Sequence, residues 1–118
     1  MTDLSVKMAG IPFKNPIIPA SGAFGFGREY EVFFPLSKLG GISVKGMTLH
    51  EKEGNPPPRV AETPAGMLNS VGLQNPGIDT FLEKELPNLV TKDTVIIANV
   101  AGGTIEDCVE IARKLEGS

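Results

Sequence analysis

Lys45 is the charged residue whose place in the sequence most favours chemistry. It ends the short apolar run at residues 41–45 (GISVK), and sites in barrels and open α/β sheets gather at the carboxyl ends of strands. An ammonium group that points inward there needs an anion, because an unpaired buried charge is costly. The alternative is a solvent-exposed lysine at a strand end, and the periodicity alone leaves both interpretations open.

A glycine-rich stretch, residues 21–27 (SGAFGFG), follows an apolar run and precedes a predicted helix. Glycines let the backbone turn sharply or approach a ligand closely, and the N–H groups of such a loop can bind a phosphate or a flavin edge. The spacing is G-x-x-G-x-G, and Lys45 stands where a dinucleotide fold has an acidic residue. The stretch therefore predicts a ligand loop, with a structural turn as the alternative and a dinucleotide site disfavoured.

Three asparagines, Asn69, Asn75 and Asn99, carry amides that could orient a planar heterocycle through matched donors and acceptors. In turn-rich sequence such residues are more often turn formers. Asn99 ends an apolar run, where a buried amide must find partners.

The remaining reactive side chains favour structural interpretations. Cys108, the single cysteine, falls on the apolar stripe of the last predicted helix and is interpreted as a small core residue. His50, the only histidine, lies in a charged run and is expected to be solvated. The sequence contains no cluster that predicts a metal site.

The elements that must position these residues alternate between strands and helices. A β-hairpin is expected from the runs at residues 4–7 and 11–18. Its second strand is expected at an edge of the sheet and should lead, through residues 17–20, into a buried strand. Further strands are expected at residues 41–45 and 94–100, and helices at residues 28–38, 78–89 and after Thr104. The run at 94–100 is apolar enough to be buried on both faces. In residues 41–45, Ile42 and Val44 share one face and Ser43 and Lys45 the other.

The last helix has the most complete set of signals. Thr104 is a good N-cap, acidic residues follow it, basic residues precede the end, and Gly117 is a stop. Its apolar stripe is predicted to comprise Ile105, Cys108, Val109, Ala112 and Leu115.

Residues 54–77 (GNPPPRVAETPAGMLNSVGLQNPG) are too rich in proline and glycine for a regular helix. Connections of this length are uncommon and are usually functional or disordered. The mixture of apolar residues and amides favours a folded excursion that lies over another part of the protein.

The element order predicts an α/β fold with a parallel sheet and right-handed crossovers. Its βα units fit an open sheet or the first three units of an eight-unit barrel, which typically needs roughly 250 residues. The chain has 118 residues, a net charge of −3 and a pI near 5.1, so it offers no basic footprint for nucleic acid. It contains no apolar run long enough to span a membrane, and the residues at its start are not expected to act as a signal peptide. The single cysteine favours a reducing compartment, and we expect a cytoplasmic protein.

Four motifs occur together in a consistent order: NPIIPASGAFGFG, the run ending in Lys45, GNPPPRVAETPAGMLNSVGLQNPG and IIANVAGG. Together they resemble the N-terminal portion of a dihydroorotate dehydrogenase catalytic subunit, in its class 1B, NAD-linked form. The resemblance covers essentially the whole chain. It implies that residues 1–118 are part of a single FMN-binding (β/α)₈ TIM barrel, which oxidises dihydroorotate to orotate in pyrimidine biosynthesis.

The resemblance also implies roles for individual residues. Ala20 and Ser21 would lie against FMN, Lys45 and Gly46 would meet its pyrimidine edge, and Asn99 would contact it. Lys45 would also help to hold the substrate, under a loop formed by Asn69, Ser70, Val71, Gly72 and Leu73. The catalytic base, a cysteine, is expected after Ser118, so the chain alone is expected not to be catalytic.

The expected partner is an electron-transfer subunit with FAD and a 2Fe–2S cluster, which passes electrons to NAD within a homo-oligomer or heterotetramer. Two alternatives remain open. One is a small α/β module that binds a flavin or nucleotide phosphate without turnover, and the other is a chain that is stable only as an assembly.

Overall fold

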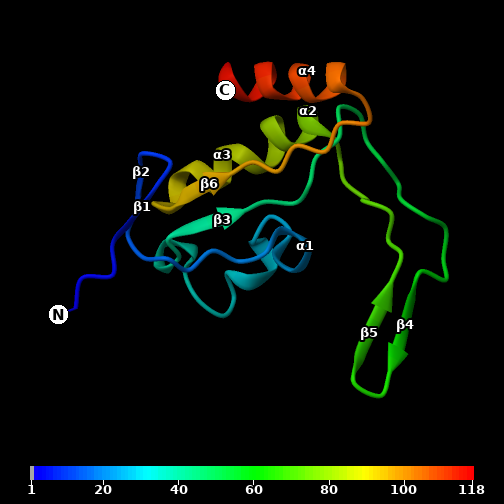
Figure 1. Cartoon of the computed structure of the whole chain (residues 1–118), viewed down its shortest axis with the longest axis horizontal. Helices are drawn as coiled ribbons and strands as arrows, with labels where there is room; N and C mark the ends of the chain where they lie inside the picture. Colours follow the sequence, from blue (N-terminus) through cyan, green and yellow to red (C-terminus); the bar gives the residue numbers. More distant parts are fainter. Residues whose placement is uncertain (1) are drawn as a thin grey trace. The chain divides into compact units, whose positions relative to one another are not determined.

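The computed structural model describes residues 2–118 and shows an α/β chain (Figure 1). By chain contacts it divides into a first unit, residues up to Gly46 with Leu82–Asn99, and a second unit, Met47–Phe81 with Val100–Ser118. The strands are β1 (Val6–Met8), β2 (Ile11–Phe13), β3 (Gly41–Ser43), β4 (Val60–Thr63), β5 (Gly66–Asn69) and β6 (Val95–Ile97). The α-helices are α1 (Ser21–Phe24), α2 (Ile78–Thr80), α3 (Leu86–Leu89) and α4 (Ile105–Glu116).

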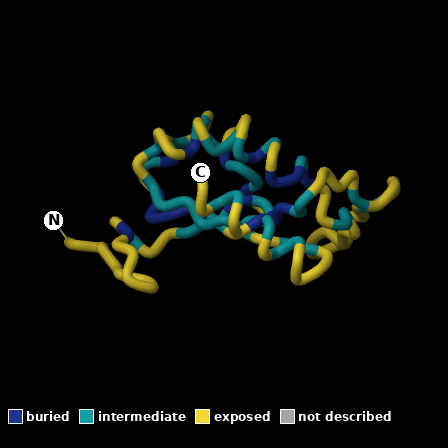
Figure 2. The backbone as a smooth tube through the Cα atoms, turned by 90° about the horizontal axis from the view of Figure 1, so that it is seen from above, coloured by how far each residue is buried: buried dark blue, intermediate teal, exposed yellow. Residues whose placement is uncertain are grey.

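In the first unit, β1 and β2 form an antiparallel hairpin in which Val6 pairs with Phe13. Apart from buried Phe13, this part of the chain is exposed, as the yellow tube beside the N-terminus shows (Figure 2). The second strand ends at Phe13, so the expected extension to residue 18 is wrong, and residues 17–20 form no strand. Pro16 and Pro19 explain this, because proline cannot donate to a strand ladder.

The helix expected at residues 28–38 is also absent. Short 3-10 helices at Arg28–Tyr30 and Leu36–Lys38 take its place. Pro35 has an extended backbone (φ −68°, ψ 132°) and separates the two turns. Proline disfavours helical geometry in the residue before it and removes a hydrogen-bond donor, so the aromatic periodicity could not produce one continuous helix.

The parallel pair β3–β6 is the centre of the first unit, with Ile42 opposite Ile96 and Ser43 opposite Ile97 (Figure 1). The predicted alternation after Gly41 is confirmed, since Ile42 and Val44 are fully buried while Ser43 and Lys45 are half-buried. The expectation for β6 is wrong, because its three residues are only half-buried. Among the described residues β6 has one ladder neighbour, β3, and its other edge has none.

The helical stretch expected at residues 78–89 is confirmed, with an irregular middle. It runs through α2, a π-helical turn at Phe81–Glu85, α3 and a 3-10 turn at Val90–Lys92. Pro87 lies in the first turn of α3, where a missing N–H costs little. Phe81 is fully buried, and Leu82 and Leu86 are half-buried.

In the second unit, α4 begins and ends where the sequence predicts. Thr104 caps it by accepting from the N–H of Asp107 (3.1 Å), and the Asp107 carboxylate accepts from the N–H of Thr104 (3.2 Å), which completes a capping box. The Lys114 ammonium contacts the Asp79 carboxylate of α2 at 2.5 Å.

The predicted apolar stripe of α4 is rotated relative to the face that packs. Ile111, which the prediction omitted, is fully buried, whereas Ile105 and Val109 are 78% and 43% exposed and Ala112 is also exposed. Cys108 and Leu115 are half-buried beside Ile111. The packed face therefore follows positions 108, 111 and 115, and the charged ends of Asp107 and Lys114 flank it.

The long excursion contains regular structure that the sequence did not predict. Strands β4 and β5 form an antiparallel hairpin with Val60 opposite Asn69, and every residue of both strands is exposed. At the two ends of the excursion, Lys52 and Asn75 exchange backbone hydrogen bonds at 2.9 Å and so join them. No helix within residues 2–118 is long and apolar enough to cross a membrane.

Candidate functional site

The glycine-rich stretch forms a fixed turn at α1 in the first unit. Ala20 accepts backbone hydrogen bonds from Ala23 and Phe24, both at 3.1 Å. Tyr30 stacks on Phe24 with ring centroids 4.4 Å apart, and its hydroxyl donates to the carbonyl of Ala23 at 2.9 Å. The turn is therefore held both by its own backbone and by the side chain of Tyr30.

Two glycines of this turn face open space. A Cβ atom added at Gly22 or Gly25 would meet no atom within 4 Å, whereas one at Gly27 would meet Phe24 and Leu36 at about 3 Å. Gly22 and Gly25 line a hollow of about 490 Å³, whose other lining residues are Ala23, Phe24, Glu29, Tyr30, Phe33 and Lys45.

Lys45 lies in this hollow, which favours the inward interpretation of its side chain. Its backbone N–H donates to the carbonyl of Gly25 at 3.0 Å and so ties the end of the β3 segment to the glycine turn. The side chain is half-buried. Within residues 2–118 its ammonium group has neither a hydrogen-bond acceptor nor a carboxylate partner, so an anion could bind there without displacing another contact. The next residue, Gly46, is buried.

Asn99 and Ser21 are joined by a side-chain hydrogen bond, in which Asn99 Nδ2 donates to Ser21 Oγ at 3.1 Å. Asn99 follows β6 and Lys45 follows β3, each two residues beyond the paired Ser43 and Ile97. The register of one parallel pair thus brings these predicted residues to the same end of the sheet. The first unit contains all five residues expected to bind a cofactor, namely Ala20, Ser21, Lys45, Gly46 and Asn99.

Of the residues expected to bind substrate, Lys45 belongs to the first unit. The other five, Asn69, Ser70, Val71, Gly72 and Leu73, lie together in the second unit, and we call them the donor segment. Three of its carbonyl groups accept hydrogen bonds from two asparagines. Asn55 donates through its side chain to Ser70 O (2.7 Å) and through its backbone to Val71 O (3.0 Å). Asn75 Nδ2 donates to Leu73 O at 2.8 Å.

The N–H groups of the donor segment are used very differently. Ser70 N donates to Arg59 O, but the N–H groups of Val71, Gly72 and Leu73 have no acceptor among residues 2–118. Gly72 and Leu73 both have positive φ angles, 75° and 59°. Successive backbone N–H groups in turn conformations can form concave sites for anions. The arrangement is suited to a carboxylate or phosphate oxygen.

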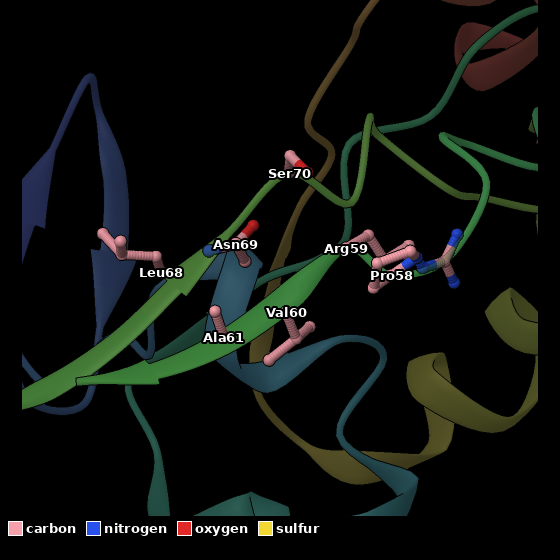
Figure 3. Close-up of a pocket in the computed structure, with 7 residues that line it drawn as sticks. All are labelled: Pro58, Arg59, Val60, Ala61, Leu68, Asn69 and Ser70. Carbon is pink, nitrogen blue, oxygen red and sulfur yellow. The ribbon is translucent and has the colours of Figure 1, made fainter.

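A shallow hollow of about 280 Å³ adjoins the start of the donor segment (Figure 3). It is lined by Pro58, Arg59, Val60, Ala61, Leu68, Asn69 and Ser70, which come from β4, β5 and the residues next to them. The Asn69 side chain has no hydrogen-bond partner within residues 2–118, so both its donor and its acceptor are free.

Asn75 serves the turn and is not available to a ligand. It is 4% exposed, and its Oδ1 accepts from Thr48 N (3.0 Å), Thr48 Oγ1 (3.1 Å) and Gly77 N (2.9 Å). Its Nδ2 donates to Leu73 O, so both ends of the buried amide are engaged by the turn. Of the two interpretations of this residue, the structure supports the turn former.

Two residues of the excursion were not singled out from the sequence. Arg59 Nη1 donates to the carbonyls of Glu53 and Asn55, and its Nη2 donates to Gln74 Oε1, so it joins both arms of the excursion. Asn55 contacts the donor segment directly. Their only sequence signal is the run GNPPPR, which indicates a turn but not which distant carbonyls the turn will meet.

The remaining candidates stay outside the site. His50 is exposed, as expected, and Cys108 is half-buried on α4. Residues 2–118 contain no group of three His, Cys, Asp or Glu side chains that could hold a metal ion.

Known proteins resemble this chain over almost its whole length. The family model of dihydroorotate dehydrogenase matches residues 3–118. The dihydroorotate dehydrogenase B (NAD(+)) catalytic subunits of Petrotoga mobilis and Thermoanaerobacter pseudethanolicus are each 59% identical to this chain, over 115 and 114 residues, which cover 98% and 97% of it. The chain spans 38% of the length of both relatives.

Solved structures of dihydroorotate dehydrogenase from Eimeria tenella share the fold. The complex with ferulenol aligns over 95% of this chain and 33% of its own, with a TM-score of 0.71 and 22% identity. The ligand-free enzyme aligns over 96% and 35%, with a TM-score of 0.71 and 23% identity. The match of the family model over residues 3–118 shows that the chain belongs to the dihydroorotate dehydrogenase family.

Proposed function

We propose that this chain is part of the catalytic subunit of an NAD-linked dihydroorotate dehydrogenase, which oxidises dihydroorotate to orotate in pyrimidine biosynthesis. Relatives at 57–59% identity bear the name of that subunit. The observation that carries the proposal is the donor segment, whose three free N–H groups suit the carboxylate that dihydroorotate and orotate share.

The residues of the first unit fit FMN as the cofactor. Gly22 and Gly25 leave open space beside the hollow, and the ammonium group of half-buried Lys45 has no carboxylate partner within residues 2–118. Ala20, Ser21 and Gly46 can bind through backbone groups. Asn99 uses one donor on Ser21 and keeps its Oδ1 and a second N–H free for a heterocycle.

When bound, FMN supplies the group that accepts hydride from the substrate. The chain's own part is to bind and orient. A fixed ammonium at Lys45 favours negative charge on a nearby ligand, because no reorganisation is needed to bring it there. The same charge attracts the anionic substrate.

For substrate binding we assign the carboxylate to the N–H groups of Val71, Gly72 and Leu73. The free amide of Asn69 and the hydroxyl of Ser70 provide matched donors and acceptors for the polar edge of the ring. A site built from hydrogen-bonding groups discriminates strongly against analogues that leave those groups unpaired.

Several further assignments follow from the resemblance and from the names of the relatives. They are a (β/α)₈ barrel as the single domain to which residues 1–118 contribute, and a cysteine base in a segment beyond Ser118. They also include a partner subunit that carries FAD and a 2Fe–2S cluster, NAD as the final acceptor, a homo-oligomeric or heterotetrameric assembly, and a cytoplasmic location.

The proposal is tested with Asn69→Ala in the full-length protein. We expect orotate affinity to fall by about tenfold, as for the loss of hydrogen bonds to a charged or strongly polar ligand, with FMN retained. Asn88→Ala is the matched control, because the Asn88 side chain makes no hydrogen bond within residues 2–118. Calorimetric titration with orotate and the flavin content measure the two effects. Loss of FMN with unchanged orotate affinity would assign Asn69 to the wrong ligand.

The second candidate is a module that binds flavin without turnover. It is favoured by the location of all five proposed cofactor residues in one unit. Titration of FMN into the 118-residue chain, followed by addition of dihydroorotate, separates the two. We expect no dihydroorotate-dependent bleaching of the flavin in this chain, and bleaching would contradict the assignment of the base to another segment. Absence of bleaching from the full-length protein as well would support the module.

A further inference from the structure

We propose that Asn55 is a positioning residue that presets the donor segment for the substrate carboxylate. The inference rests on the proposed function, since it names the residue that prepares the same site. Asn55 itself lies on the opposite side of the backbone from the N–H groups that it orients.

Asn55 holds two successive peptide groups of the donor segment. Its Nδ2 donates to Ser70 O at 2.7 Å, and its backbone N–H donates to Val71 O at 3.0 Å. Its own carbonyl accepts from Arg59 Nη1 at 3.0 Å, so the residue is anchored from behind. The side chain and the backbone of Asn55 thus each donate a hydrogen bond to one of two adjacent carbonyl groups.

Because the peptide group is planar, these two hydrogen bonds also fix the directions of the N–H groups in the same peptide units. In a trans peptide the carbonyl of one residue and the N–H of the next are held in one plane and point in opposite directions. Tying Ser70 O therefore aims the Val71 N–H away from Asn55, and tying Val71 O does the same for the Gly72 N–H. These are two of the three N–H groups that lack an acceptor in the described chain.

Gly72 shows how closely the two segments lie. A Cβ at this position would come within 2.8 Å of Asn55 Cγ and Nδ2 and 2.9 Å of its backbone nitrogen. Asn55 and Ser70 are both exposed, so few other packing contacts fix the segment. Ordering such a segment at the moment of binding costs affinity, and a contact that orders it beforehand removes that cost.

The test uses the full-length holoenzyme with Asn55→Ala, and Asn88→Ala as the matched control. We expect orotate Kd and dihydroorotate KM to rise by about tenfold. We expect kcat to stay within about twofold, because the lost preorganisation weakens ground state and transition state alike. FMN content and melting temperature should match the control, which a general structural role would not allow.

Asn55→Asp provides a second variant of the same shape, which places an acceptor against Ser70 O and removes the donor. It should raise orotate Kd at least as much as Asn55→Ala. Unchanged orotate affinity in either folded variant would overturn the inference, and so would loss of FMN or failure of both variants to fold. If the unmodified holoenzyme fails to bind orotate, the proposed function itself is wrong, and the two failures are thereby distinguished.

Discussion

At the scale of single residues, three asparagines that look alike in the sequence differ in the hydrogen-bonding capacity they have left. Asn75 is buried and engages both its Oδ1 and its Nδ2 inside the turn, whereas Asn99 uses one donor on Ser21. The side chain of Asn69 makes no hydrogen bond within residues 2–118. An amide offers two donors and two lone pairs. The donors and acceptors that remain unused, more than the residue type, therefore distinguish a structural asparagine from one available to a ligand.

Asn75→Ala should destabilise the protein by about 3 kcal/mol, because it leaves the buried N–H of Gly77 and the part-buried donors of Thr48 without an acceptor. Chemical denaturation measures the change. The matched Asn88→Ala substitution should cost less than about 0.5 kcal/mol, as is usual for a side chain without partners. Equal losses for the two variants would show that the buried amide is not what holds the excursion closed.

At the scale of elements, the excursion and α4 show opposite relations between sequence and structure. The caps of α4 are local interactions among Thr104, Asp107 and their neighbours, and they were predicted correctly. Which face of α4 packs depends on distant residues, and that prediction was wrong. In the excursion, the β4–β5 hairpin was not predicted because its strands are exposed on both faces, so they carry no simple period-two burial pattern.

The corrected face of α4 predicts a large difference between two isoleucines of one helix. Ile111→Ala should cost about 3 kcal/mol, since it removes a fully buried side chain and leaves a cavity. Ile105→Ala, at a position 78% exposed, should change stability by less than about 0.5 kcal/mol. Paired denaturation curves decide between the faces. A greater loss at position 105 would restore the stripe expected from the sequence.

At the scale of the whole molecule, the described chain leaves sheet edges and apolar side chains open. Strands β3 and β6 pair with each other, and within residues 2–118 each has a second edge without a ladder partner. Val32, Phe33 and Ile105 are all about four-fifths exposed. Unpaired edges and exposed apolar surface both favour association between chains.

We therefore expect the isolated 118-residue chain to self-associate. Size-exclusion chromatography with light scattering should show an average mass that rises with concentration. The double substitution Val32→Lys and Phe33→Lys should lower that mass, because it replaces the most exposed apolar pair with charges. A monodisperse monomer that melts in one cooperative transition would contradict this prediction and show that the open edges are tolerated.

The sequence by itself determined what depends on near neighbours and on family pattern. Period-two alternation put Ile42 and Val44 inside, and the residues around Thr104 and Gly117 marked the ends of α4. The motifs were sufficient to indicate the dihydroorotate dehydrogenase family. Pro16, Pro19 and Pro35 prevented the longer strand and the longer helix that the apolar patterns predicted. Each proline lacks the backbone N–H that a strand ladder or a helix requires.

Only the tertiary structure decided which polar groups are left free. The bonds of Asn55 to Ser70 and Val71 join residues 15 and 16 positions apart, and those of Asn99 to Ser21 join residues 78 apart. No local propensity encodes such pairings, since they form only when the chain folds back on itself. The three free N–H groups of the donor segment, and the unpaired ammonium of Lys45, follow from that folding and could not be read from residue types.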